Sequence, residues 1–431
     1  MKKKNFNIAI VGLGNIGLSL YRHLINNKKS IKKKTNVSLT VKYVSAKNKL
    51  KKRKIKIPKN KWLKNYLEAF KKPEIDIVVE LIGGSDGAAK KLVFNSIKNK
   101  KHVVTANKAL ISKHGDELAK FAEKNKVNLE FEAAVAGGVP IIRVIKEGLI
   151  TNKIHKICGI LNGTSNYILS KMFEKNMNFL DVLNDAKKLG YAESNPAADL
   201  NGDDAKSKIQ ILSSLTFNSL INRSKINVEG IKNIDQVDIK NAKLLGYKIK
   251  HLAIAELKKN KLIQRVHPCM VPNNSYISNI DGVLNAVIVD GKPIGRFTIQ
   301  GEGAGPGPTT SSLVSDICSI LRGNIKFPFS IPNENRKKIN SIDISEETFS
   351  SYIRLDVIDK TGVLSSITKI LSKNKVSVKR LIQNPFKSKK FASIIIISHK
   401  AKNYNLVKSI NELSKKKFVI NKPKFFRIEE I

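Results

Sequence analysis

The sequence predicts an α/β protein with a doubly wound parallel sheet at its N-terminus, an α+β domain in the middle and a ferredoxin-like βαββαβ unit at its C-terminus. In residues 1–148, short apolar runs alternate with amphipathic stretches, and a glycine-rich turn follows the first apolar run. Residues 346–431 read strand, helix, strand, strand, helix, strand. At 431 residues, the chain is long enough for roughly three domains.

The first unit, residues 1–148, contains five strand-like runs with helical spacing between them. Strands that alternate with helices form a parallel sheet through right-handed crossovers. The charge run at residues 47–61 lacks apolar periodicity, so we expect an exposed loop there. The expected strands are Asn7–Val11, Ser38–Val44, Ile75–Leu81, His102–Thr105 and Val127–Phe131.

The middle unit, residues 149–345, has longer helical segments and then further strands. A proline- and glycine-rich stretch at 301–308 predicts a loop, after which a helix over 309–321 could return to pack on the first unit. Residues 328–345, rich in Asn, Lys and Ser, are typical of a linker. The other expected elements are helices Phe179–Leu189 and Asp204–Leu215, and strands Leu262–Met270, Ala286–Asp290 and Arg296–Gln300.

The C-terminal unit, residues 346–431, resembles an ACT domain. Its order of elements is that of a ferredoxin-like fold, and the turn Asp359–Leu364 lies between the first strand and the first helix, as in ACT domains. The expected elements are Tyr352–Val357, Val363–Lys373, Val376–Gln383, Ala392–Ser398, Tyr404–Leu413 and Phe425–Ile428.

The composition narrows the class of protein. The formal charge of +44 suggests nucleic-acid binding, but the lysines are spread over nearly every segment and no nucleic-acid recognition motif accompanies them. No apolar run is long enough to cross a membrane, and the basic N-terminus leads directly into a strand, so we expect a cytoplasmic protein. The single, scattered cysteines Cys158, Cys269 and Cys318 support neither disulfides nor zinc.

The turn Gly12-Leu13-Gly14-Asn15-Ile16-Gly17 follows a strand and precedes a helix, which is the context of a dinucleotide-binding Rossmann motif. Gly12 would permit the tight turn, Gly14 the approach of the pyrophosphate, and Gly17 close packing of helix on strand. The second strand ends without an acid, and Ser45 and Lys47 there favour the 2′-phosphate of NADP(H) over NAD(H). The alternative, that Lys47 is one more exposed lysine, stays open.

A dense polar segment lies at residues 190–208. It combines four acids and two lysines with Tyr191 and Asn195, and Pro196 and Gly202 fix turns within it. A helix should begin near Asp203, where an acid is favourable. Asp204 and Lys208 are four residues apart, so one helical face would bring the carboxylate to the ammonium.

This segment closely resembles the signature of the homoserine dehydrogenase family. Further stretches look like family motifs in family order, and together the resemblance covers essentially residues 5–431. They are 104–110, 131–142, 159–167 and the Gly301–Gly305 loop. One departure is visible, because Asn195 stands where the family usually has Asp, and any role that needs a charge there is in doubt.

The resemblance implies a reversible, nicotinamide-dependent reduction of L-aspartate 4-semialdehyde to L-homoserine, in the synthesis of threonine, methionine and isoleucine. It makes Lys208 the acid/base, with Lys108 near nicotinamide and substrate and Asp204 in support. It implies substrate contacts for Glu193, Asp199, Tyr191, Thr164 and Gly163, and cofactor contacts also for Thr105, Lys108 and Gly303. A monovalent cation, Na⁺ or K⁺, would bind at Glu132, Val135, Gly137 and Val139.

Two rival readings remain open. An aspartate-semialdehyde dehydrogenase would need a cysteine nucleophile in a glycine-flanked motif, which the three cysteines do not offer. A ligand-sensing regulator would bind nucleotide without turnover. By resemblance, the ACT-like unit suggests feedback by threonine, although it could also serve only in assembly, and a homodimer or homotetramer is expected.

Overall fold

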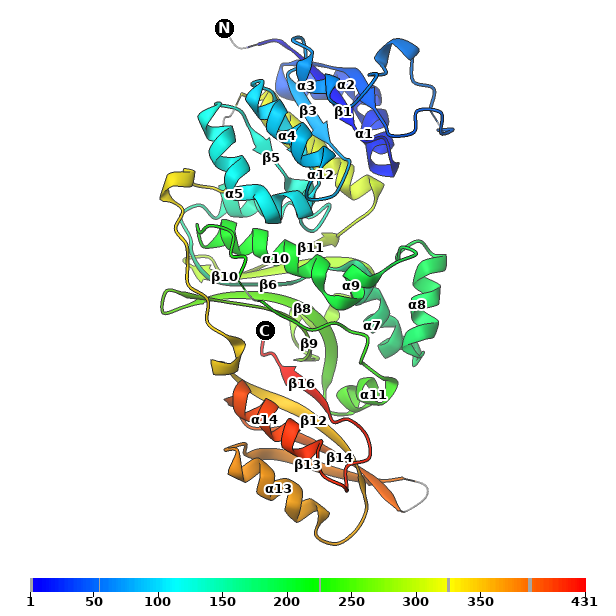
Figure 1. Ribbon diagram of the computed structural model, residues 1–431, viewed down its shortest axis with the longest axis vertical. Coiled ribbons are helices and arrows are strands. Elements are labelled where there is room, and N and C mark those ends of the chain that lie inside the picture. The colour runs from blue at the N-terminus through cyan, green and yellow to red at the C-terminus, as the bar shows by residue number, and fades with distance from the viewer. Residues whose placement is uncertain (1–2, 54, 225, 324–325, 387–389) are drawn as a thin grey trace.

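The computed structural model describes residues 3–53, 55–224, 226–323, 326–386 and 390–431. Its elements form three tiers along the long axis, with the N-terminal sheet and its helices at one end and the C-terminal unit at the other (Figure 1). The middle tier is built around a large mixed sheet.

The first tier contains a parallel sheet in the order β2-β1-β3-β4-β5. The central strands and the second half of β1 are buried, because helices cover both faces of a doubly wound sheet, whereas the edge strand β2 is partly exposed. All five strands expected from the sequence are present, although the last is only two residues long. The strands are β1 (Asn5–Val11), β2 (Ser38–Ser45), β3 (Ile77–Glu80), β4 (His102–Thr105) and β5 (Leu129–Glu130).

The helices of this tier follow the strands in turn. Each buries an apolar face, as Leu20 and Leu24 do in the first helix and Leu92 and Val93 in the fourth. They are α1 (Asn15–Asn26), α2 (Lys28–Thr35), α3 (Glu68–Lys71), α4 (Ala88–Lys98) and α5 (Lys108–Lys124).

Helix α12 (Pro306–Leu321) returns from the middle tier to the first, as the sequence suggested. Its residues Leu313 and Ile317 share one buried cluster with Ile8 and Ile10 of β1. The predicted loop over 301–308 is wrong at both ends, because β11 runs to Glu302 and the helix begins at Pro306. Proline is tolerated in the first helical turn, where its missing N–H has no intrahelical partner.

The middle tier carries the mixed sheet, in which β6 (Lys153–Ile160) pairs with β8 (Tyr247–Lys258) and β10 (Leu284–Lys292). Beyond these lie β9 (Lys261–Pro272) and β11 (Gly295–Glu302), and the short β7 (Asn227–Val228) pairs with β9. The helices are α6 (Ile141–Arg143), α7 (Gly163–Lys175), α8 (Phe179–Lys188), α9 (Ala197–Asn201), α10 (Asp203–Thr216) and α11 (Gln236–Leu244).

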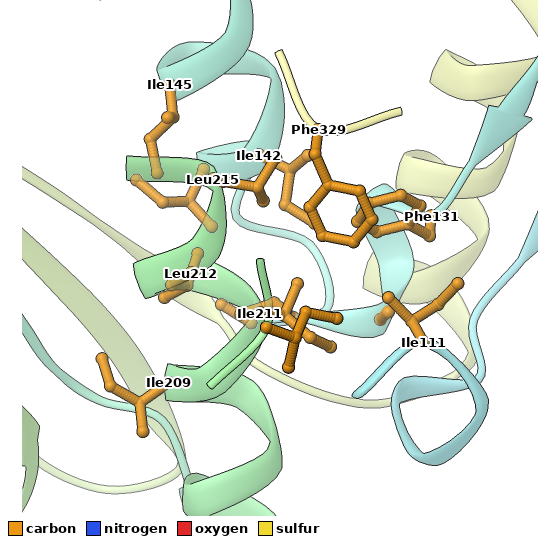
Figure 2. Packing of buried hydrophobic residues seen from close by; sticks show 14 of the residues in the cluster. Ile111, Phe131, Ile142, Ile145, Ile209, Ile211, Leu212, Leu215 and Phe329 are labelled. Carbon is orange, nitrogen blue, oxygen red and sulfur yellow. The ribbon is translucent and has the colours of Figure 1, made fainter. Parts of the chain in front are cut away.

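Helix α10 is fixed between the first tier and the mixed sheet. Ile211, Leu212 and Leu215 of this helix share one buried cluster with Ile111 of α5 and with Phe329, and Figure 2 shows these side chains. Because α5 begins at Lys108 and α10 contains Lys208, this apolar contact sets the position of both lysines.

The C-terminal tier has the predicted order of elements. Its sheet runs β16-β12-β14-β13, which is the 4-1-3-2 order of a ferredoxin-like unit, and the two-residue β15 (Ala401–Lys402) pairs with β12. The elements are β12 (Thr348–Ile358), α13 (Val363–Lys373), β13 (Val378–Pro385), β14 (Phe391–Ser398), α14 (Asn403–Leu413) and β16 (Lys424–Ile428).

The sequence did not predict that this sheet is continuous with the middle sheet. Strand β16 pairs in parallel with β9, with Arg427 opposite Cys269 and Ile428 opposite Met270. Buried ion pairs cross the same junction: Arg265 of β9 binds Glu429, and Arg354 of β12 binds Asp238 of α11.

The segment expected as a linker, 328–345, is anchored along its length. Phe329 is fully buried, and the Arg336 guanidinium stacks over its ring with 4.0 Å to the centroid. Arg336 also forms an ion pair with Asp116 of α5 at 2.8 Å. Buried side chains such as Phe329 and Arg336 therefore hold the segment in place, and it is not a free spacer.

Candidate active site

The glycine turn between β1 and α1 has three different local environments. Gly12 has φ +108°, and a Cβ there would lie 2.3 Å from the Leu81 carbonyl oxygen. A Cβ on Gly17 would lie 2.0 Å from the Gly12 oxygen, whereas one on Gly14 would meet no protein atom within 4 Å. Neighbouring backbone atoms thus leave no room for a side chain at Gly12 and Gly17, and the space above Gly14 is open.

A cleft of about 650 Å³ lies beside this turn. Ser45 and Lys47 line it together with Gly12 and Gly14, so the structure brings the predicted residues of the two strand ends together. Three further cations of the charge run and Lys64 beyond it line the same cleft, and one of them, Arg53, lies over the Trp62 ring. These additional lining cations are Lys49, Lys51, Arg53 and Lys64.

A neighbouring cleft, lined by Asn15, Ile16, Gly83 and Asn107, continues from the glycine turn toward the start of α5. A fully buried carboxylate, Glu80, holds the lining residues Ile82 and Gly83 in place. It accepts hydrogen bonds from the Thr105 hydroxyl at 2.6 Å and from the backbone N–H of Ile82 at 2.7 Å. The Thr105 oxygen in turn accepts the Asn107 N–H at 3.0 Å.

The Thr105 hydroxyl proton is therefore directed to Glu80. Sequence reasoning missed Glu80 and Asn107, although an acid at the end of β3 followed by two glycines was a usable signal. Asn107 also caps α5 by accepting the Leu110 N–H, which fixes the helix that begins with Lys108.

At the start of α5, two lysines meet one carboxylate. Lys208 Nζ lies 2.8 Å from Asp204 Oδ2, as the four-residue spacing predicted, and Lys108 Nζ lies 2.7 Å from Asp204 Oδ1. Lys208 also donates to the Leu161 carbonyl oxygen at 2.6 Å. The Lys208 side chain is 10% exposed and that of Lys108 is 43% exposed, so the two ammonium groups differ in access to solvent.

The charges of this group are mutually dependent. Burial raises the pKa of the Asp204 carboxyl, but the attraction of Lys208 and Lys108 outweighs it and holds that pKa well below the usual range. Burial lowers the pKa of Lys108, and the opposing charge and hydrogen bond of Asp204 more than reverse this, so the net pKa is raised. Asp204 is thus a fixed anion that keeps Lys108 protonated.

Asp199, at the other side of the group, has a raised pKa. Burial is the main cause, and the charge of Asp204 adds to it. The side-chain amide of Asn162 lies between the two carboxylates, 2.7 Å from Asp199 Oδ1 and 3.0 Å from Asp204 Oδ2. Asn162 was not among the predicted site residues.

The remaining predicted substrate residues border this group. Thr164 donates its hydroxyl to the Tyr191 carbonyl oxygen at 2.7 Å, and a Cβ on Gly163 would lie 2.7 Å from the Val283 oxygen. Tyr191 is 44% exposed. Glu193 is exposed, and its charge contributes to the raised pKa of Lys108, so it lies on the solvent side of the lysines.

Asn195 retains a turn at the position where it departs from the family signature. Its side-chain oxygen accepts the Ala197 N–H at 3.3 Å. The local backbone geometry thus does not need a carboxylate there.

The predicted cation residues lie in one buried loop that contacts the Gly303 backbone. The Glu132 carboxylate accepts one backbone N–H on each oxygen, from Ile142 and Arg143, which leaves each oxygen a further lone pair. The Gly137 carbonyl oxygen accepts the Ser312 hydroxyl at 2.6 Å. Burial raises the pKa of Glu132 to about 7. A carboxylate beside backbone carbonyls is a suitable oxygen donor set for a hard cation.

Gly303 lies at the junction of the cation loop and the mixed sheet. A Cβ there would lie 2.1 Å from the Asn285 amide carbon, and a Cβ on Gly137 would lie 2.4 Å from the Gly303 oxygen.

Among the described residues, no helix has both the length and the apolar character needed to cross a membrane.

Two family models match the chain, one described as the NAD binding domain of homoserine dehydrogenase over residues 12–132 and one as homoserine dehydrogenase over residues 140–318. A homoserine dehydrogenase of Neisseria gonorrhoeae is 39% identical over 402 residues and 92% of each chain. One of Helicobacter pylori is 38% identical over 432 residues, covering 99% of this chain and 100% of the relative. The solved structure of a homoserine dehydrogenase from Thiobacillus denitrificans superposes with a TM-score of 0.93 at 35% identity, covering 100% of this chain and 99% of the other.

Proposed function

Because this chain belongs to the homoserine dehydrogenase family, we propose that Lys208 is the acid/base that serves its reaction, the interconversion of L-aspartate 4-semialdehyde and L-homoserine. The chain is an oxidoreductase that uses a nicotinamide cofactor. The observation that carries the role of Lys208 is its buried ammonium, which is directed by Asp204 and by the Leu161 carbonyl.

The bound nicotinamide supplies a hydride to the aldehyde carbon, or accepts it from homoserine. In the reduction, the chain must supply a proton to the oxygen on which negative charge develops, and in the oxidation it must accept the proton of the homoserine hydroxyl. A lysine ammonium has three N–H groups. Two of them are directed to Asp204 and Leu161. Among the residues that the structure describes, the third has no partner, so it is available to the substrate oxygen. Fixed orientation of this donor lowers the entropic cost of proton transfer.

Lys108 is proposed to face both nicotinamide and substrate. It is more exposed than Lys208 and is tied to the second oxygen of Asp204, so it adds a positive charge close to the developing alkoxide. Glu193 is proposed to bind the substrate ammonium, while Asp199, Tyr191, Thr164 and Gly163 complete the pocket.

The cofactor preference is proposed to be NADP(H) over NAD(H). The strand end at Ser45 and Lys47 carries no carboxylate that would repel a 2′-phosphate, and the cleft beside it is lined by four further cations. The other proposed cofactor contacts are Gly12, Leu13, Gly14, Asn15, Ile16, Gly17, Thr105, Lys108 and Gly303.

We also propose a monovalent cation, Na⁺ or K⁺, at Glu132 with the carbonyl oxygens of Val135, Gly137 and Val139.

The proposed domains are 1–148, 149–345 and 346–431. The last is proposed as an ACT domain that binds threonine, in a homodimer or homotetramer. Its 4-1-3-2 sheet order supports the fold of such a domain. The cytoplasmic location stays a prediction.

One assay tests the enzymatic role. Purified protein with NADPH and aspartate semialdehyde should consume the reduced-cofactor absorbance band, and homoserine with NADP⁺ should restore it. A ligand-sensing protein would bind the nucleotide with no such change, which would overturn the proposal.

Threonine added to the same assay should inhibit, and replacing Asp359 by Ala in the turn before α13 should weaken that inhibition without changing the uninhibited rate.

A further inference from the structure

We propose that Asn162 is a positioning residue of the reaction, whose neutral amide bridges Asp199 and Asp204 so that Asp204 presents Lys208 to the substrate oxygen. Asn162 lies between β6 and α7, it is buried, and no role at the active site follows from the sequence motifs. The inference rests on the proposed acid/base role of Lys208.

The orientation of the amide is fixed from the side of the helix. Asn162 is the N-cap of α7, and its Oδ1 accepts the Ser165 N–H at 2.8 Å. An N–H donor at one end requires the oxygen there, so the amide nitrogen must point the other way. The cap therefore determines which end of Asn162 faces the two carboxylates.

The amide nitrogen has two hydrogens and two acceptors. It lies 2.7 Å from Asp199 Oδ1 and 3.0 Å from Asp204 Oδ2, so each carboxylate receives one hydrogen. Two carboxylates that approach without a donor between them favour protonation of one of them. Asn162 supplies that donor without adding a charge.

The residue before it, Leu161, accepts a hydrogen bond from Lys208 at 2.6 Å. Residues 161 and 162 thus contact both members of the pair that four-residue spacing on α10 brings together. The group is further tied down on the Asp199 side, because the Ser165 hydroxyl donates to the Asp199 carbonyl oxygen at 3.0 Å.

The charged groups around Lys208 come from four elements. Asp204 lies on its own helix, α10, Lys108 begins α5, Asp199 lies on α9, and Glu193 lies in the loop before α9. Of these groups, Asp199 and Asp204 lie within hydrogen-bond distance of the neutral Asn162 amide. A negative charge introduced at residue 162 would sit within hydrogen-bond distance of two of the anions.

Asn162→Asp and Asn162→Ser form the test, because both new side chains are good N-caps and neither carries the amide donor. Asn162→Asp adds a charge, and the lysine-dependent limb of the kcat–pH profile should move up by about one unit. Asn162→Ser should lower kcat by about 10-fold or more, with the KM for NADPH and the melting temperature unchanged and the limb not raised.

The inference is overturned if the Asn162→Asp profile superimposes on that of the parent, or if Asn162→Ser keeps kcat within twofold. Should Asn162→Asp not fold, the Asn162→Ser measurement decides alone. Failure of the proposed function would be seen separately, as an inactive parent or as a Lys208→Ala variant that keeps the parent's rate.

Discussion

Lys108 and Lys208, a hundred residues apart in sequence, donate to opposite oxygens of the same carboxylate, that of Asp204, at 2.7 and 2.8 Å. The first lysine comes from the N-terminal sheet domain and the second from the helix that lies on the mixed sheet. The relative position of the N-terminal sheet domain and the helix on the mixed sheet is therefore linked to one buried anion.

Replacing Lys208 by Ala should lower kcat by about 10²- to 10⁴-fold, the usual effect of losing a general acid. Lys206→Ala, on the same helix and outside the cluster, is the matched control and should keep kcat within twofold. A Lys208→Ala variant with less than a tenfold loss would remove Lys208 from the chemistry.

Gly14→Ala should raise the KM for NADPH by about 10-fold or more while leaving the melting temperature unchanged, because the added methyl meets only the open space in which a pyrophosphate would lie. Gly17→Ala is the structural counterpart, since its methyl would overlap the Gly12 oxygen. It should lower the melting temperature. Equal thermal destabilisation by both variants would contradict this division of roles.

Lys47→Glu should reduce kcat/KM for NADPH more than for NADH, because a carboxylate at the strand end repels a 2′-phosphate and accepts ribose hydroxyls. The expected change in the NADPH-to-NADH ratio is about 10-fold. Lys59→Glu, elsewhere in the charge run, controls for the loss of general positive charge. If the two variants change the ratio equally, Lys47 has no specific contact.

Because of Glu132, we expect the effect of Na⁺ on the melting temperature to depend on pH. Its folded pKa, about 7, lies above its ordinary value of 4.5, so the folded state binds the extra proton between these limits. The contribution of Glu132 to the free energy of unfolding is therefore largest below pH 4.5 and is lost as the pH rises to 7. A cation competes with that proton, and NaCl should raise the melting temperature more at pH 8 than at pH 6.

Choline chloride at the same ionic strength is the control for salt effects on Glu132. Glu132→Gln keeps only one of the two backbone hydrogen bonds, so its melting temperature should be lower at every pH. The rise in melting temperature that NaCl causes should then be the same at pH 6 and pH 8. A sodium effect that is independent of pH in the parent would argue against a cation at this carboxylate.

Removing residues 346–431 should destabilise the remaining chain, because Arg265 and Asp238 would lose the buried partners Glu429 and Arg354. Arg265 keeps its ion pair with Glu256 at 2.7 Å, whereas Asp238 loses its cation, which costs at most about 3–5 kcal/mol. Thermal melting and soluble yield measure the effect, with Lys400→Ala, which breaks an exposed pair within the C-terminal unit, as the control. A truncated chain that melts like the parent would show that the junction contributes little.

Much of the fold could be predicted from local patterns. The buried strands of the first sheet are short apolar runs bounded by turns, and α13 begins and ends where the periodicity placed it. The start of α12 was missed because Pro306 and Pro308 were read as loop residues, whereas in a first helical turn they replace donors that have no partner.

Some residues of the candidate site could likewise be predicted from local sequence patterns, and others could not. The Asp204–Lys208 contact follows from spacing on one helix, and the role of the glycines from their place after a strand. Asn162 and Glu80 act through partners 25 to 42 residues away, and the pairing of β16 with β9 joins segments far apart in the chain. No local periodicity encodes such contacts.

The continuous sheet has a mechanical consequence. Neighbouring strands twist as one surface, so a change of twist at the outer edge of the C-terminal unit cannot be absorbed by a flexible joint before it reaches β9. Helix α10 lies on β8 and β9, and Gln264 of β9 donates to Ser213 of that helix at 2.5 Å. A molecule that stiffened the distal strands would therefore act, through the β16–β9 pairing, on the sheet under the helix that carries Lys208, at a distance from the pocket.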